Sequence, residues 1–259
     1  MRIHRGYTTS DLHLLSNRSS ADRLMPRLHQ ATAEADLCIL NGDIFDFQWS
    51  VYPDLRESLD YAENWIRDLV SQYRHCRFVF LMGNHDSLPA YGDLLDALAG
   101  THENLAWEPF HLKLGSKVFL HGDVGSSSHC PEALAAYRQR WHGRRRRAWV
   151  RAAYLACTHL GIPRLIHECT PVRRYAGDVV AYLKAELGPA FTEVRDVYFG
   201  HSHKPVTDYQ WQGLRFHNTG ATIHRVRSRI QTFTYDPADL ERAFEPSTPA
   251  AQTKDPARR

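Results

Sequence analysis

Asp11 and His13 lie two residues apart at the end of a run that reads as a β-strand, "RIHRGYTTSD" and its continuation. Side chains at positions i and i+2 of an extended segment point to the same face, so this carboxylate and imidazole can converge on one small object. A metal ion is the obvious candidate. Taken alone, the pair is explained equally well by an Asp11 that caps a turn and a partly buried, polar His13.

Four further segments place side chains of metal-binding type directly after a predicted strand. They contribute Asp43 in "NGDIFD"; Asn84, His85 and Asp86 in "MGNHDS"; His121 in "VFLHGD"; and His201 and His203 in "FGHSHKP". Ligands of open α/β sheets bind at the carboxyl ends of strands, so segments far apart in sequence can meet at one rim. Each motif alone is weak, but the ordered set favours one shared site.

The residue types in these segments indicate which ions they could hold. Carboxylates, imidazoles and an amide oxygen, without a thiolate, suit Mn²⁺, Fe or Zn²⁺ in a catalytic site better than a structural zinc site. Two such ions about 3.5 to 4 Å apart can share a water, lower its pKa and clamp the phosphoryl oxygens during in-line attack. The natural use of such chemistry is hydrolysis of a phosphoester.

The elements that must position these residues alternate between short strands and helices in the first third of the chain. Strands are predicted over 2–11, 36–43 and 77–86. An amphipathic helix over 20–35, interrupted near Pro26, and a second helix over 54–76 separate them. This β-α-β-α-β order is typical of a sheet flanked by helices.

The second half of the chain has a different pattern. A hairpin is predicted to turn at Gly115 and Ser116, and runs over 194–203, 205–220 and 221–236 predict further strands of a second, mixed or largely antiparallel sheet. The intervening residues 131–187 are helical in pattern and long for a connection, which predicts a helical cap over the metal rim. We expect one domain over 1–235, then a short element and a disordered tail over 236–259.

Composition narrows the class of protein. The 259 residues are 43% hydrophobic, and 32 basic against 29 acidic residues give a net charge of +3, too balanced to indicate a nucleic-acid or membrane partner. Five scattered cysteines without a C-x-x-C pair predict reduced thiols. No run approaches the roughly 18 apolar residues of a membrane-spanning helix. We expect a soluble, cytoplasmic protein, with its oligomeric state open.

The ordered motifs "DLH", "GDIFD", "GNHD", "HGD" and "GHSH" resemble those of the calcineurin-like metallophosphoesterase family, D-x-H, G-D-x-x-D, G-N-H-D/E, H and G-H-x-H. The resemblance runs from Asp11 to His203, and every motif position is filled. It implies an α/β fold, a four-layer α/β/β/α sandwich of two mixed sheets. It also implies a two-metal centre, for which we expect Mn²⁺, with Fe or Zn²⁺ as alternatives.

Carried over residue by residue, the resemblance assigns Asp11, His13, Asp43 and His203 to a first ion and Asp43, Asn84, His121 and His201 to a second, with Asp43 as the bridge. The family uses the histidine at position 85 to stabilise charge on the phosphoryl group or to protonate the leaving oxygen, so His85 is a predicted catalytic residue; the alternative is a core histidine. Asp86, the second predicted catalytic residue, and Asp46 are expected to orient water or His85. Both are alternatively solvated acids in turns.

Substrate binding is assigned to the cap. Residues 137–160 gather arginines with Trp and Tyr, and Arg144 and Arg147 are the candidate substrate-binding residues. Such a cluster can bind phosphates, stack on bases or lie on an anionic membrane surface, but it can also be the solvated face of a helix. The cap resembles that of the UDP-2,3-diacylglucosamine hydrolases, which cleave a nucleotide-sugar pyrophosphate. Those enzymes usually carry Arg where this chain has His85.

Two other functions share these motifs. A non-catalytic scaffold of the same fold predicts the loss of a ligand, and none is missing from the sequence. A nuclease predicts salt-sensitive activity on DNA and usually needs a long coiled coil or second domain, for which this chain has no pattern. The expected partner is a phosphorylated small molecule, with peripheral membrane contact as an alternative and no obligate nucleic acid.

Overall fold

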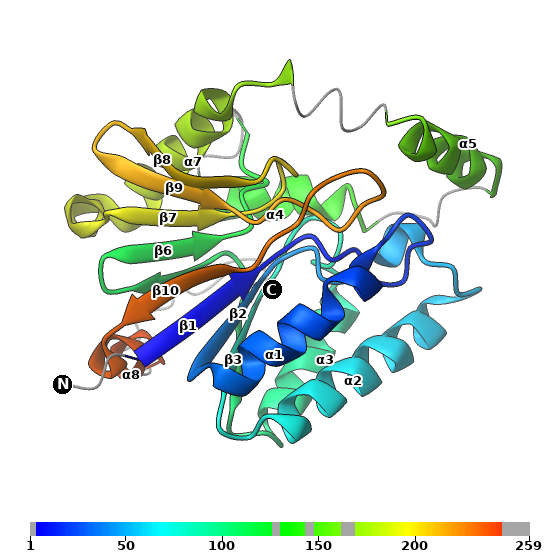
Figure 1. Ribbon diagram of the computed structural model, residues 1–259, viewed down its shortest axis with the longest axis horizontal. Coiled ribbons are helices and arrows are strands. Elements are labelled where there is room, and N and C mark those ends of the chain that lie inside the picture. Colours follow the sequence, from blue (N-terminus) through cyan, green and yellow to red (C-terminus); the bar gives the residue numbers. More distant parts are fainter. Residues whose placement is uncertain (1–3, 126–129, 143–147, 162–168, 245–259) are drawn as a thin grey trace, which may run out of the picture.

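The computed structural model describes residues 4–125, 130–142, 148–161 and 169–244 (Figure 1). Its first sheet has the strand order β10-β1-β2-β3-β4. The strands are β1 (His4–Thr9), β2 (Leu37–Asn41), β3 (Arg77–Leu81), β4 (Leu105–Glu108) and β10 (Gln231–Tyr235). β1 to β4 run parallel, so their carboxyl ends share one edge, while β10 is antiparallel to β1. The sequence grouped β10 with the second sheet, which is wrong.

The second sheet is mixed and has the order β5-β6-β7-β9-β8. Its strands are β5 (His111–Leu114), β6 (Lys117–Leu120), β7 (Asp196–Phe199), β8 (Val206–Trp211) and β9 (Leu214–Asn218). Leu114 pairs with Lys117, which confirms the hairpin predicted at Gly115 and Ser116. β6, β7 and β9 are parallel, so β6 and β7 end at a common edge.

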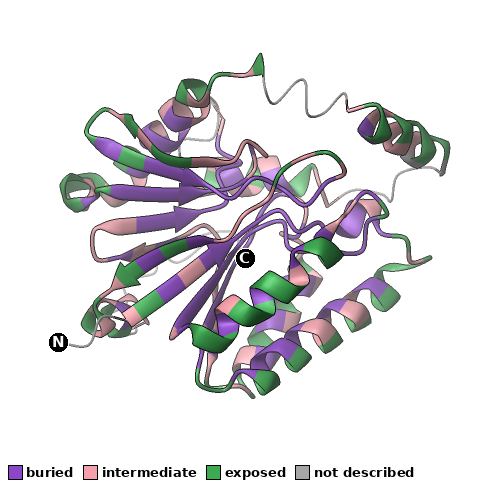
Figure 2. Cartoon of the chain, viewed as in Figure 1, coloured by how far each residue is buried: buried purple, intermediate pink, exposed green. Residues whose placement is uncertain are grey.

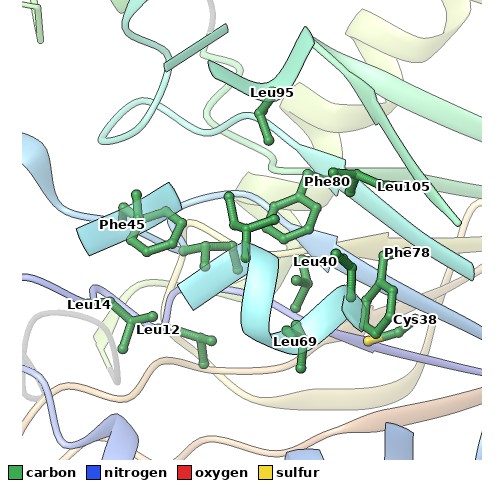
Figure 3. Packing of buried hydrophobic residues seen from close by; sticks show 14 of the residues in the cluster. Leu12, Leu14, Cys38, Leu40, Phe45, Leu69, Phe78, Phe80, Leu95 and Leu105 are labelled. Atoms are coloured by element: carbon green, nitrogen blue, oxygen red, sulfur yellow. The ribbon is translucent and has the colours of Figure 1, made fainter. Parts of the chain in front are cut away.

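Alternating side chains of the strands separate two hydrophobic layers. Leu37 and Ile39 of β2 belong to the core between the two sheets, where they join Phe119 of β6. Cys38 and Leu40 point the other way and pack with Leu69 under the helices (Figure 3). Successive side chains of these strands point to opposite faces of the sheet, and both faces are buried. The strands therefore appear in the sequence as continuous apolar runs. Figure 2 shows the resulting buried strands and the outer helix faces that remain exposed.

Helices cover the outer face of each sheet, which confirms the predicted α/β/β/α sandwich. The first sheet is covered by α1 (Met25–Glu34), α2 (Leu55–Gln72) and α3 (Pro89–Ala99). α2 begins where the Asp54 side chain accepts the Glu57 N–H at 2.8 Å. Pro26 lies in the first turn of α1, where its missing N–H costs nothing, so the predicted interruption is in fact the start of this helix.

The outer face of the second sheet is covered by residues that the sequence assigned to the cap. Leu134 of α4 (Pro131–Gln139) and Val179 and Leu183 of α7 (Val172–Leu187) are buried against this sheet. The predicted cap over 131–187 is therefore too long. Of the described helices in that stretch, only α5 (Ala148–His159) stands apart from the sandwich (Figure 1).

The short C-terminal element is α8 (Pro237–Phe244), whose Leu240 joins the core between the sheets. The tail predicted beyond it lies outside the described residues. None of the described helices is long and apolar enough to cross a membrane.

Candidate metal centre

The loops that follow β1, β2, β3, β6 and β7 meet at the carboxyl ends of these strands. Backbone hydrogen bonds join them: Asp11 N–H donates to the Gly42 carbonyl at 3.0 Å, and His13 N–H donates to the Asp43 carbonyl at 3.0 Å. Gly200 N–H donates to the His121 carbonyl at 2.7 Å. The His201 N–H after β7 donates to Asp11 Oδ1 after β1 at 3.1 Å, so loops of both sheets meet at one rim.

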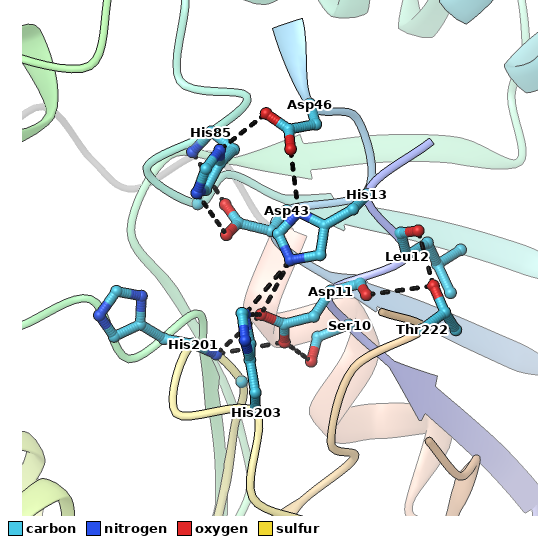
Figure 4. A network of polar contacts seen from close by, with 12 residues as sticks. Ser10, Asp11, Leu12, His13, Asp43, Asp46, His85, His201, His203 and Thr222 are labelled. Carbon is cyan, nitrogen blue, oxygen red and sulfur yellow. Dashed lines mark hydrogen bonds and ion pairs between the residues drawn. The ribbon is translucent and has the colours of Figure 1, made fainter. Parts of the chain in front are cut away.

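A first group of candidate ligands consists of Asp11, His13 and His203 (Figure 4). The Nε2 atoms of His13 and His203 are 3.2 Å apart, and His203 Nε2 is 3.2 Å from Asp11 Oδ1. The Asp11 carboxylate is held in place by the backbone N–H of His201, 3.1 Å from each oxygen, and by the Ser10 hydroxyl. Three ligand atoms therefore face one another in a buried position.

A second group consists of Asp43, His121 and His201. His121 Nδ1 is fixed 3.1 Å from the Asn41 carbonyl, which turns Nε2 toward Asp43 Oδ2 at 3.1 Å. Among the described residues, both ends of the buried Asn84 amide lack a hydrogen-bond partner. Buried polar atoms are rarely left unpaired, so this donor set fits a cation.

The backbone is strained at these positions. Nine non-glycine residues of the described chain have a positive φ, and five of them are candidate ligands. These five are Asp11 (φ 54°), His13 (48°), Asp43 (53°), His201 (58°) and His203 (53°). The left-handed region costs an ordinary residue about 1 to 2 kcal/mol. Such strain persists where a structure needs it for function, which favours these residues as the ligands.

Two glycines allow the close approach of the loops. A Cβ at Gly83 would overlap the Asp43 carboxylate and lie 2.7 Å from the Asp43 nitrogen. A Cβ at Gly200 would overlap the Asp11 carboxylate. No side chain larger than hydrogen fits at either position without displacing a candidate ligand.

Asp46 orients two histidines at once. Its Oδ1 is 2.8 Å from His85 Nδ1, and its Oδ2 is 3.6 Å from His13 Nδ1. These contacts leave the Nε2 atoms of both histidines to face the centre of the site. His13, Asp46 and His85 also form a group whose side chains could hold a metal ion. However, Asp46 faces the Nδ1 atoms of both histidines, and these are the nitrogens that such an ion would need.

Arg18 is a buried residue of the site that the sequence did not reveal, because no motif contains it. Its Nη2 donates to Asp46 Oδ2 at 2.6 Å and its Nη1 donates to the Tyr154 hydroxyl of α5 at 3.0 Å. Its guanidinium also lies 5.7 Å from the Trp49 ring centroid. Arg18 therefore links α5 to the carboxylate that holds His85.

Asp86 has different contacts from those predicted. Its Oδ1 accepts the Gly83 N–H at 2.7 Å and its Oδ2 accepts the Ile44 N–H at 2.8 Å. Asp46, and not Asp86, holds the His85 ring. Asp86 thus fastens the loop after β3 to the loop after β2.

The calcineurin-like phosphoesterase family model matches residues 7–205, a span that includes every candidate ligand. The chain belongs to the calcineurin-like phosphoesterase family. Membership implies metal-dependent hydrolysis of a phosphoester. A search of curated proteins found no match to the chain.

The charges of this phosphoesterase fit a cation. Burial lowers the pKa of His13 to about 4, and Arg18 adds to that effect, so the imidazole is neutral and able to bind a metal. Burial alone would raise the pKa of Asp43, but His121 and His85 outweigh it and hold the pKa well below its ordinary value. Burial would likewise lower the pKa of His121, yet Asp43 raises it to about 10. A positive charge is thus favoured beside Asp43.

The arginines of residues 137–160, predicted to bind substrate, include one with a structural role. Arg138 is buried, and its Nε and Nη2 donate to the Asp123 carboxylate at 2.7 and 2.8 Å. It anchors α4 beneath the His121 loop, so it is a structural residue and not part of a substrate-binding surface. Arg144 and Arg147, the candidate substrate ligands, lie outside the described residues.

Proposed function

We propose that this phosphoesterase uses two divalent metal ions to hydrolyse a phosphoester. The observation that carries the proposal is the presence of two separate buried groups, Asp11 with His13 and His203, and Asp43 with His121 and His201. Both groups lie on one rim where loops of two sheets meet. A single ion would leave one group without a function.

The proposed ligands of the first ion are Asp11, His13, Asp43 and His203, and those of the second are Asp43, Asn84, His121 and His201. Asp43 is the proposed bridge because its carboxylate belongs to the second group, while its carbonyl accepts the N–H of His13, a member of the first group, at 3.0 Å. The shell of oxygen and imidazole ligands supports Mn²⁺, with Fe or Zn²⁺ as alternatives. When bound, such ions polarise the phosphoryl group and lower the pKa of water.

His85 is the proposed catalytic residue. Its backbone N–H donates to Asp43 Oδ1 at 2.9 Å, which fixes the residue beside the centre. Its Nδ1 is held by Asp46, and its Nε2 lies 4.0 Å from Asp43 Oδ2, where it can reach the leaving oxygen of a phosphoester. We propose that His85 protonates this oxygen and that Asp46 keeps the imidazole in the orientation that the transfer needs.

The substrate is proposed as a phosphorylated small molecule. A UDP-2,3-diacylglucosamine-type pyrophosphate stays an alternative, but its support came from the arginines of the cap, and Arg144 and Arg147 lie outside the described residues. The broader proposal rests on the described residues alone. It therefore covers phosphomonoesters, phosphodiesters and pyrophosphates.

A panel of phosphoesters with metal analysis tests the proposal. We expect the chelated protein to be inactive and to regain hydrolysis when Mn²⁺ is added. Asp43→Asn keeps the size of the side chain and removes its charge, so it should lower metal content and activity together. A protein that stays near zero metal under Mn²⁺ supply, or that hydrolyses esters equally well after chelation, would refute the proposal.

A further inference from the structure

A cavity of about 160 Å³ adjoins His85. Its wall is formed by the 3-10 helix η2 (Phe47–Trp49), the loop after it, the first turn of α2, the loop after β3 and the residues that follow α4. The lining residues come from three stretches of the chain, 47–58, 85–88 and 141–142, and none of them is a proposed metal ligand. It is therefore a separate feature of the site.

The wall of the cavity combines apolar and aromatic side chains, such as Phe47, Tyr52 and Trp141, with polar ones, such as Asp54 and His142. The centroids of the Trp141 and His85 rings are 4.9 Å apart. Among the described residues of the wall there is no Lys or Arg. A phosphate would therefore be poorly held beside Asp54, whereas an uncharged ring could pack against the aromatic side chains of the wall.

Gln48 supplies a polar group in this wall. The residue is only 6% exposed, and its Oε1 is buried without a hydrogen-bond partner among the described residues. An unpaired buried oxygen costs about 1 to 3 kcal/mol, so a turn of the carboxamide that brings it to a ligand in the cavity is favoured. Because a carboxamide can turn to offer either oxygen or NH₂, a hydroxyl group on a bound ring could pair with it in both orientations.

His85 connects the cavity to the metal centre. It lines the cavity and also places its Nε2 4.0 Å from Asp43 Oδ2. A group that occupies the cavity is thus separated from the candidate metal ligands by the residue proposed to protonate the leaving oxygen. A substrate whose phosphoryl group lay at the metal centre would therefore place its leaving group in this cavity.

We propose that the cavity is a leaving-group subsite that takes an aromatic ring bearing a hydrogen-bonding group on its edge, with Gln48 as the specificity-determining residue. The inference rests on the proposed function and names the substrate class more closely. The preferred substrates are aryl phosphoesters, or esters whose leaving group carries a flat ring close to the ester oxygen.

Binding of phosphonates tests the subsite without turnover. For the wild-type chain loaded with Mn²⁺, calorimetry should show 4-hydroxyphenylphosphonate bound about 10-fold more tightly than methylphosphonate, because the ring is desolvated in the cavity. Equal affinity for the two phosphonates would overturn the subsite. This arm needs no variant, so it does not depend on the folding of one.

A pair of substrates tests the role of Gln48. The leaving phenols of 4-hydroxyphenyl and 4-methylphenyl phosphate have similar size and acidity. The ratio of the two kcat/KM values therefore reports the contribution of a hydrogen bond made by the 4-hydroxyl group. Gln48→Leu should reduce this ratio by about 2- to 10-fold, the worth of one hydrogen bond. Gln72→Leu, the same change on the exposed end of α2, is the matched control and should keep the wild-type ratio.

The two proposals can fail separately. Selective binding of the arylphosphonate without hydrolysis of any ester would keep the subsite and overturn the proposed function. Hydrolysis with an unchanged ratio in Gln48→Leu, confirmed as folded by circular dichroism, would overturn the role of Gln48.

Discussion

At the scale of single residues, two candidate ligands are each held by a backbone partner that fixes the direction of the binding atom. The Asn41 carbonyl fixes His121, and the His201 N–H fixes Asp11. Partners of this kind orient a ligand before the metal binds. The site is therefore organised by the protein and not only by the ion.

His85→Ala separates the catalytic role from coordination. Because His85 is held by Asp46 and Asn84 is the proposed ligand of its loop, the variant should keep the metal content of the wild type. Its kcat should fall by about 10² to 10⁴, as for loss of a general acid. Metal analysis and single-turnover rates check both expectations.

His121→Ala is the contrasting variant, since it should lose metal and regain part of its activity in excess Mn²⁺. The loss in His85→Ala should also be smaller for p-nitrophenyl phosphate, whose leaving group needs little protonation, than for an alkyl phosphate. Loss of metal from His85→Ala, or an equal effect on both esters, would contradict protonation by His85.

Gly83→Ala tests the close approach of the loops. The new methyl group would overlap the Asp43 carboxylate, so we expect the variant to lose metal affinity and to melt at a lower temperature than the wild type. Gly177→Ala, a substitution within α7, is the matched control. Its new Cβ would lie 3.6 Å from the Trp211 side chain, which is an ordinary van der Waals contact. Alanine there should raise stability by about 0.5 to 1 kcal/mol. Wild-type metal affinity in Gly83→Ala would show that Asp43 is not placed as described.

At the scale of elements, the sequence predicted the strands that carry the ligands because their apolar runs end in polar, glycine-containing turns. It missed α3 and β4, which carry no ligand, and it placed β10 in the wrong sheet because strand pairing depends on contacts distant in sequence. It also could not distinguish the fourth layer from the cap, since an amphipathic helix such as α7 has the same pattern in either place. Arg18 escaped it because its partners, Asp46 and Tyr154, come from other segments, and Gln48 escaped it because several stretches of the chain form the cavity that it lines.

The docking of α5 can be tested by hydrogen exchange. Tyr154 contacts Arg18 and lies 4.6 Å from the Trp49 ring, so Tyr154→Ala should speed exchange of the α5 amides while leaving β1 to β3 protected. Trp149 is on the same helix and is 68% exposed, so Trp149→Ala should leave the exchange of α5 unchanged. The same exchange in both variants would mean that Tyr154 does not dock the helix.

At the scale of the whole molecule, two sheets that each bury a face against the other also share the metal centre, so stability and site geometry depend on the same packing. A polar cluster at the far end of β7 contributes to this packing. Asp196 accepts hydrogen bonds from Arg215 Nε and Nη2, both at 2.8 Å, and lies 3.2 Å from His217 Nε2. The strand ends that bear the ligands are at the opposite edge.

Acid titration tests the contribution of this cluster. Burial raises the pKa of Asp196, but the bonds from His217 and Arg215 outweigh it and lower the pKa to about 2. A depressed carboxylate pKa stabilises the folded state above the unfolded pKa of about 3.9, and this stability is lost as the pH falls toward 2. Arg215→Met should therefore cost about 1 kcal/mol at pH 7, after allowance for solvent screening, and progressively less below pH 4.

Denaturant unfolding of both proteins between pH 7 and pH 2.5 measures this difference. Arg229→Met is the control, because Arg229 donates to the Thr207 hydroxyl and not to a carboxylate. A cost of Arg215→Met that does not change with pH would argue against the ionised pair.

The two-ion assignment is tested most directly by the metal content of three proteins after dialysis against Mn²⁺. The wild type should hold about two ions per chain. Asp11→Ala should hold about one, because Asp11 belongs only to the first group, whereas Asp43→Ala should hold less than one, because Asp43 is the proposed bridge. A wild type with one ion, or equal losses in the two variants, would contradict a centre in which Asp43 joins two ions.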